Sequence, residues 1–214
     1  MKHMKSLTLL KLGLLKLGLL KLGLLKFGLL TFGLMFVSCN SNTINIGNGG
    51  GSGTDLSLNS TLKTNELNAS NQQALLDAIN AKRASGFNCP APVGARPTVP
   101  AVTWNAKLEL MSLKHTNVLV NVNADFGKVD PHSGVGDGNL STRAEGVGYA
   151  FLAVGENIAG GQLTVTEAMN DWLNSSGHCG AIMDADFMQI GASKLSTTGG
   201  AYATYWTLNF GKPQ

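Results

Sequence analysis

The chain has little charge, few cysteines and no long uninterrupted apolar run. Only 14% of its 214 residues are charged and 43% are hydrophobic, which is the composition of a globular protein rather than of a disordered one. In the apolar N-terminal segment, the lysine-free stretch 27–38 has twelve residues, fewer than the roughly 20 that a helix needs to cross a bilayer. This stretch therefore favours the hydrophobic region of an export signal over a transmembrane helix.

Residues 1–38 contain six lysines and no acidic residue, and Lys-Leu-Gly-Leu-Leu repeats run through 11–30. A lysine every five residues advances about 500° around a helix of 3.6 residues per turn, so the charges do not share one face. An amphipathic helix lying on a membrane is therefore disfavoured.

The signal ends in Phe36-Val37-Ser38-Cys39, which resembles the lipobox of bacterial lipoproteins. That resemblance implies that Cys39 is lipidated and becomes the new N-terminus; a plain secretory signal and a retained membrane anchor are the alternatives. Asn40 resembles an outer-membrane address. We expect an exported protein of the bacterial cell envelope, lipid-anchored at the outer membrane, or else periplasmic or secreted.

Basic residues are concentrated in the signal. Without its six lysines, 10 basic residues face 13 acidic ones and the net charge is −3. No basic stripe remains, so a nucleic-acid partner is not expected. We expect the exported protein to be a monomer.

Three cysteines are an odd number, which in an exported protein would leave one thiol over. If Cys39 carries lipid, Cys89 and Cys179 remain as a pair in an oxidising compartment. This hypothesis predicts a disulfide that closes a loop of about 90 residues.

Residues 39–70 are rich in Asn, Ser, Thr and Gly and have few large apolar side chains. Such a segment buries too little surface to offset its ordering entropy. We predict a flexible tether over 39–70 that leads to one domain over 71–214.

Within that domain, capping patterns and apolar spacing predict three helices. A capping box at 70–73 opens the first, which Gly86 ends; the second follows Asn105; a capping box at 164–167 opens the third, which ends at 176–177. A short helical turn is expected at 140–145 and a proline-rich loop at 89–100. Strand-like segments at 155–159, 188–195 and 202–210 complete an α+β pattern.

His115 lies on the apolar stripe of the second helix. An imidazole on such a face is more often a hydrogen-bonded core residue than a ligand. We therefore interpret His115 as structural.

Several short motifs along the domain occur in one order and spacing. They are Trp104-Asn105 before the helix with His115, His132-Ser133-Gly134, Asp137-Gly138, Arg143, Gly148-Tyr149, Gly155-Glu156-Asn157-Ile158-Ala159, 172–178 with its Gly177-His178, and Tyr205-Trp206-Thr207. Together they resemble the CAP superfamily of cysteine-rich secretory proteins, antigen 5 and pathogenesis-related proteins (SCP domain), in its bacterial secreted or lipoprotein form. The resemblance implies a three-layer α-β-α sandwich around a small, mainly antiparallel sheet, and its bacterial members often pair cysteines placed like Cys89 and Cys179.

The resemblance also implies a polar cleft in which His132, Glu156 and His178 could hold zinc or another divalent metal. The family's second glutamate is missing, because Asn174-Ser175 stands where it is expected; Glu145 is a nearby substitute. We expect supporting roles for the side chains of Asn157, Arg143, Ser175 and Glu145.

Catalysis has weaker support than binding. There is no His-Glu-x-x-His helix and no nucleophile elbow, and the missing glutamate removes a ligand or a general base. The preferred interpretation is a module that binds a ligand or partner through the polar cleft. The alternatives are a metal-assisted, protease-like hydrolase and a structural interaction scaffold. The resemblance suggests a lipid, a sterol or a protein as partner.

Overall fold

The computed structural model describes residues 62–214. The predicted signal segment 1–38, the lipidation site Cys39 and most of the predicted tether lie outside the described residues. Within the described part, no helix combines the length and apolar character needed to cross a bilayer.

A mixed sheet of four strands forms the middle layer of the domain. Its order is β3 (Thr103–Trp104), β5 (Gln189–Ser196), β6 (Thr204–Pro213), β4 (Phe151–Gly160). Strand β3 pairs parallel with β5, whereas β5–β6 and β6–β4 are antiparallel. A small hairpin of β1 (Phe87–Asn88) and β2 (Ala95–Arg96) lies apart from this sheet.

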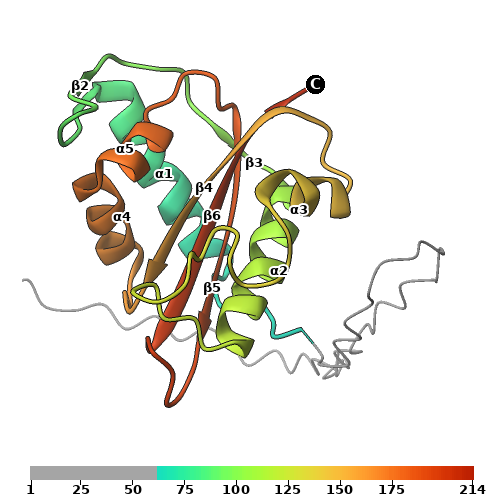
Figure 1. Cartoon of the computed structure of the whole chain (residues 1–214). Coiled ribbons are helices and arrows are strands. Elements are labelled where there is room, and N and C mark those ends of the chain that lie inside the picture. Colours follow the sequence, from blue (N-terminus) through green and yellow to red (C-terminus); the bar gives the residue numbers. More distant parts are fainter. Residues whose placement is uncertain (1–61) are drawn as a thin grey trace, which may run out of the picture. The chain divides into compact units, whose positions relative to one another are not determined.

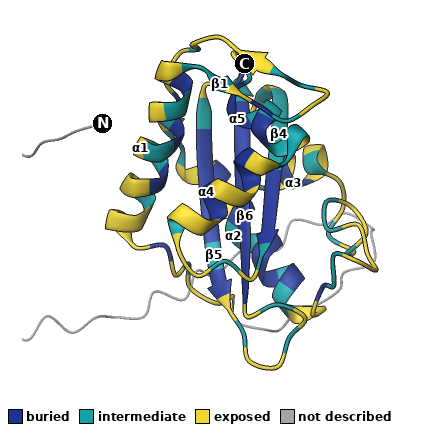
Figure 2. Cartoon of the chain, turned by 90° about the vertical axis from the view of Figure 1, so that its left-hand side faces the viewer, coloured by how far each residue is buried: buried dark blue, intermediate teal, exposed yellow. Residues whose placement is uncertain are grey.

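Helices cover both faces of the sheet (Figure 1). One face carries α1 (Ala69–Ser85), α4 (Val165–Asn174) and α5 (Ser176–Ile182), and the other carries α2 (Ala106–Asn121) and α3 (Leu140–Gly146). The strands β5 and β6 are buried along nearly their whole length (Figure 2). The predicted α+β class and its three layers are thus confirmed.

The domain begins before residue 70. Leu67 is buried, the Glu66 N–H donates to Lys194 O at 3.0 Å, and the Asn65 amide donates to Glu109 Oε1 at 3.0 Å. The end of the predicted tether is therefore packed against β5 and α2.

Helix α1 starts after Asn68, whose side chain accepts from the Asn71 N–H at 2.9 Å. The capping box predicted at Ser70 is wrong by about half a turn, because Asn caps a helix as well as Ser does.

The third predicted helix begins as expected but does not end the helical region. Thr164 and Glu167 form the predicted capping box of α4. After Ser175, whose backbone is extended (φ −102°, ψ 128°), the chain turns at once into α5. The prediction that 176–177 ends the helix misses α5, so His178 lies on a short helix rather than in a loop.

Helix α2 lies unusually close to the sheet. A Cβ built at Gly191 of β5 would come within 2.0 Å of the Glu109 backbone nitrogen. Beside it, the buried Thr116 hydroxyl contacts those of Ser193 (2.5 Å) and Thr207 (2.8 Å). At these positions a glycine and three hydroxyl side chains lie between the helix and the sheet, where larger apolar residues are usual.

A buried arginine on α1 connects loops on the sheet face that carries α1, α4 and α5. The Arg83 guanidinium donates to four carbonyl oxygens, those of Pro100 (2.7 Å), Ile182 (2.7 Å), Asp184 (2.8 Å) and Phe187 (2.9 Å). Burial lowers the pKa of Arg83, and the nearby Asp184 carboxylate partly offsets that effect. This clamp holds the C-terminal end of α5.

The predicted disulfide between Cys89 and Cys179 is present. It links the turn after β1 to the middle of α5, and both cysteines are buried. The helix that carries His178 is therefore fixed by the disulfide and by Arg83.

Substituting Gly191→Ala should destabilise the domain, because the new methyl group can fit only if α2 moves away from β5. We expect a loss of about 2–3 kcal/mol in the free energy of unfolding, measured by urea denaturation. Gly177→Ala is the matched control, since nothing lies within 4 Å of a Cβ there. Equal stability of the two variants would contradict the close packing.

Removing the disulfide with Cys89→Ser and Cys179→Ser should lower the unfolding free energy by about 4 kcal/mol, since the cross-link spans 90 residues. Urea denaturation of the oxidised wild type, the reduced wild type and the double variant checks this. The reduced wild type should match the variant. A difference below about 1 kcal/mol between oxidised wild type and variant would show that the cross-link adds little.

Candidate functional site

Two consecutive residues of β4 contact the two segments that carry the histidines of the predicted site. Glu156 points toward the layer of α2 and α3, and its Oε1 lies 3.0 Å from His132 Nδ1. The next residue, Asn157, points toward the other layer and donates its amide to His178 O at 3.1 Å. Consecutive residues of a strand face opposite sides, so Glu156 holds the loop with His132 and Asn157 holds the helix with His178.

Glu156 is buried, with 2% of its side chain exposed, and both its oxygens have partners. Oε1 accepts from Arg143 Nη2 at 2.8 Å as well as from His132. The Asn209 amide, oriented so that both its ends face suitable partners, donates to Oε2 at 3.1 Å and accepts from Ser112 Oγ at 2.8 Å. The predicted supporting role of Arg143 thus corresponds to a direct ion pair.

The loop that presents His132 is held from three directions. The Arg143 Nη1 donates to His132 O at 2.8 Å, and the Asp130 carboxylate accepts from the His132 N–H at 3.0 Å. His115 Nε2 lies 2.9 Å from Pro131 O, and its Nδ1 lies 2.6 Å from Asp137 Oδ2. His115 is therefore a hydrogen-bonded core residue, as interpreted, and it also anchors both ends of segment 131–137.

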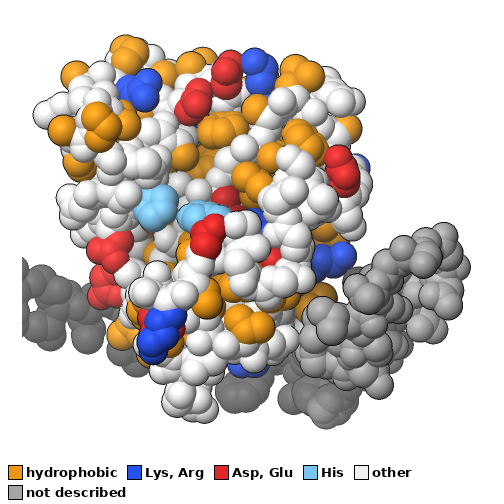
Figure 3. Space-filling view, viewed as in Figure 1, with side chains coloured by type: hydrophobic (Ala, Val, Ile, Leu, Met, Phe, Trp, Pro, Cys, Tyr) orange, Lys and Arg blue, Asp and Glu red, His pale blue; other side chains and the backbone are white. Residues whose placement is uncertain are grey.

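His132 and His178 reach the surface together. Their ring centroids lie 6.5 Å apart with an interplanar angle of 54°. His132 has 43% of its side chain exposed and His178 is half-buried, whereas His115 is fully buried. Histidine side chains are accordingly visible on the molecular surface in Figure 3. Burial lowers the pKa of His178, and the neighbouring His132 lowers it further.

Two predicted supporting residues take no part in this arrangement. Glu145 is exposed on α3 and makes no hydrogen bond or ion pair with a histidine of the described residues. Ser175 connects α4 to α5, and its side chain does not cap α5. Asn209 also belongs to the site, and we did not predict it. A sequence signal could have indicated it, because Asn209 is an amide on the face of β6 opposite the one that carries Leu208 and Phe210.

The hydrogen bond to Glu156 occupies only one ring nitrogen of His132. If His132 donates its Nδ1 proton to Glu156, its Nε2 keeps a lone pair toward solvent. A nucleophile would have to bond to such a base. Among residues 62–214, no serine, threonine or cysteine side chain bonds to a histidine ring; Ser133 donates to Asp130 instead.

The donor set, as arranged, does not fit a divalent metal. Within the described part of the chain, no three His, Cys, Asp or Glu side chains are grouped so that they could hold an ion. Glu156 Oε1 is bonded to a guanidinium, whose charge opposes a second cation at that oxygen. This arrangement therefore supports no metal-dependent step at the site.

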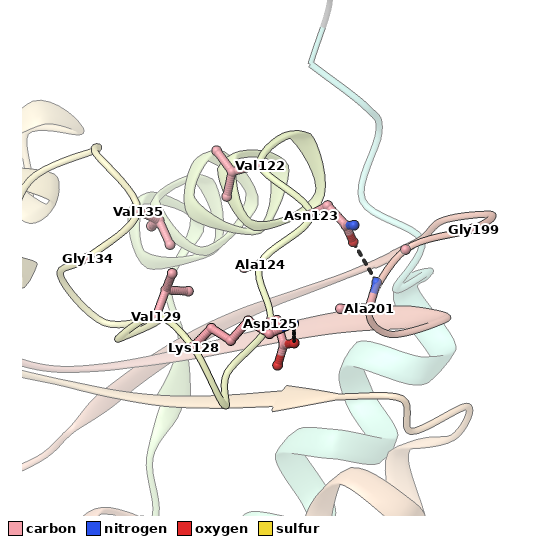
Figure 4. A pocket seen from close by; sticks show the side chains of 11 residues that line it. Val122, Asn123, Ala124, Asp125, Lys128, Val129, Gly134, Val135, Gly199 and Ala201 are labelled. Carbon is pink, nitrogen blue, oxygen red and sulfur yellow. Dashed lines mark hydrogen bonds and ion pairs between the residues drawn. The ribbon is translucent and has the colours of Figure 1, made fainter.

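Two cavities lie away from the histidines. One of about 590 Å³ is bounded by the end of α2, the following loop and the β5–β6 hairpin, and is lined by residues that include Val122, Val129, Val135 and Ala201 (Figure 4). The other, of about 200 Å³, lies between α2 and α3 and is lined in part by Arg143 and Asp137. Neither is lined by His132, Glu156 or His178.

Comparison with known proteins gives one family. The sequence profile of the cysteine-rich secretory protein family (CAP) matches residues 76–210. YkwD, an uncharacterized protein of Bacillus subtilis, is 35% identical over 63 residues, which are 29% of this chain and 23% of YkwD.

Solved structures share the fold. An extracellular protein containing an SCP domain from Bacillus anthracis has a TM-score of 0.52 at 23% identity, over 67% of this chain and 40% of that one. An outer surface protein from Borrelia burgdorferi has a TM-score of 0.55 at 19% identity, over 68% of this chain and 95% of that one. The chain thus spans less than half of YkwD and of the B. anthracis protein.

The lowered pKa of His178 gives the stability of the domain a defined pH dependence. Below pH about 6.5 the unfolded state takes up this proton more readily than the folded state does. The unfolding free energy should therefore fall as the pH is lowered from about 7 to 5. In His178→Gln this slope should be shallower, as urea denaturation across the pH range would measure. Identical slopes would show that His178 has an ordinary pKa.

Proposed function

Because the chain belongs to the cysteine-rich secretory protein (CAP) family, we propose that its folded domain is a binding module. The observation that carries this proposal is the engagement of Glu156, which accepts from His132, Arg143 and Asn209. A carboxylate with these three partners is poorly placed to take a proton from a substrate or a water molecule. The groups left for recognition are the two surface imidazoles.

The surface around these imidazoles suits a protein partner. Ser133, Gly134 and Gly177 are near the histidines in sequence and at least partly exposed, and they have small side chains, so a partner can approach the backbone closely. Imidazole rings supply both apolar area and hydrogen-bonding atoms. Neither of the two cavities is lined by the histidines. They therefore give no support to an enclosed lipid or sterol site at the histidines.

We place this module outside the cytoplasm, in the cell envelope. The lipobox at Cys39 supports a lipid anchor at the outer membrane, and the buried disulfide supports an oxidising compartment. The solved relatives are named as an extracellular protein and an outer surface protein. The domain acts as a monomer, without a nucleic-acid partner.

The test is capture of envelope proteins on the immobilised full chain. We expect a partner that is retained by wild type and lost, by at least about tenfold, in the double variant His132→Ala and His178→Ala. Gln73→Ala, on the exposed side of α1, is the matched control and should retain it. Equal retention by all three proteins would exclude the histidine surface.

The same samples separate the alternatives. A lipid or sterol extracted from wild type and absent from the double variant would replace the protein partner. Turnover of a peptide or ester library that is lost in Glu156→Gln would support the hydrolase. A partner that binds independently of both histidines would support the scaffold.

A further inference from the structure

The buried charges around Glu156 form a cluster with its own cation. The Arg143 side chain is 6% exposed, and its guanidinium lies 2.8 Å from Glu156 Oε1 and 3.4 Å from Asp137 Oδ1. Asp137 itself is mostly buried. Two carboxylates are thus held in one polar pocket of the protein, where an uncompensated charge is costly.

His115 holds the same cluster from helix α2. Its Nε2 lies 2.9 Å from Pro131 O and its Nδ1 lies 2.6 Å from Asp137 Oδ2. The same Nε2 lies 3.9 Å from Glu156 Oε1. The ring therefore fixes Asp137 and the loop beside Glu156, and Arg143 is the cation held against both carboxylates.

Arg143 is not free to leave this cluster. Its Nη1 donates to His132 O at 2.8 Å and to Gly138 O at 3.1 Å, while Nη2 donates to Glu156. These acceptors lie on the loop and on β4, so the planar guanidinium is fixed by its geometry. An incoming divalent ion would have to displace these hydrogen bonds and tolerate a positive charge beside its ligand.

We propose that Arg143 is the built-in cation of this site and determines its selectivity against metal ions. The guanidinium neutralises Glu156, the carboxylate that a divalent ion would need as a ligand beside the histidines. The site of this chain works without a metal, and removing the positive charge of Arg143 creates a metal site. The inference concerns the same residues as the proposed function but does not depend on any partner.

Zinc alone is the probe, titrated into the full chain in competition with a chromogenic chelator. Wild type should show no zinc binding that His132→Ala removes. Arg143→Gln, which cannot carry the charge, should bind zinc roughly tenfold or more tightly than wild type. That gain should disappear in the double variant Arg143→Gln and His132→Ala. Arg96→Gln, an exposed arginine on β2, is the control and should behave as wild type.

Arg143→Glu provides a second measurement in case Arg143→Gln folds poorly. It would place another carboxylate beside Glu156, so the metal-free protein should melt at a lower temperature than wild type, and zinc should raise its melting temperature. The proposal is overturned if wild type binds zinc through His132, or if both folded variants gain no affinity. The proposal is also overturned if both variants stay unfolded in the presence of zinc. Zinc bound at Glu156 should supply the positive charge that Arg143 no longer provides, and so should restore folding.

Partner capture is a separate readout. Loss of the envelope partner in the histidine variant, without any zinc effect in the Arg143 variants, would leave the proposed function intact and reject this inference. Partner retention that does not depend on the histidines, together with a zinc site created in the Arg143 variants, would reject the proposed function and support this inference.

Discussion

The buried carboxylate of Glu156 organises one whole side of the domain. Water is excluded from it, so each of its oxygens must find donors inside the protein. The donors come from three separate parts of the chain: the loop with His132, helix α3 with Arg143, and strand β6 with Asn209. Since breaking a buried pair leaves a charge uncompensated, at a cost of about 3–5 kcal/mol, this one side chain stabilises a loop that has few apolar anchors of its own.

The position of α2 is a condition for this arrangement. His115 can meet Asp137 and Pro131 only because its helix lies against β5, and that approach requires the missing side chain at Gly191. The other layer is fixed by different means, with Arg83 at the end of α5 and the disulfide in its middle. The two histidines therefore reach the surface from two independently rigid elements, and Glu156 and Asn157 of β4 connect them.

Local signals in the sequence predicted much of this, and long-range polar contacts account for what they missed. The caps at Asn105 and Thr164, the strand periodicity and the disulfide are confirmed because each depends on nearby residues or on a short count of cysteines. Helix α5 was missed because a serine and a glycine normally end a helix, whereas here its stability comes from Cys179 and Arg83. Arg83 gave no signal, since an arginine is expected at the surface and its four acceptors lie 17 to 104 residues away.

The same distinction separates the residues of the site from their roles. Motifs brought His132, Glu156, His178, Arg143 and Asn157 into view, but no motif states which oxygen a guanidinium will occupy. In the folded chain Arg143 pairs with Glu156 and Asp137 below the surface, and burial lowers the pKa of the His178 ring. Recognition at this surface then depends on two imidazoles that lie above paired charges in the interior. A partner selected by such a surface would need hydrogen-bonding and shape complementarity more than opposite charge, because the charges of Arg143, Glu156 and Asp137 are already paired below it.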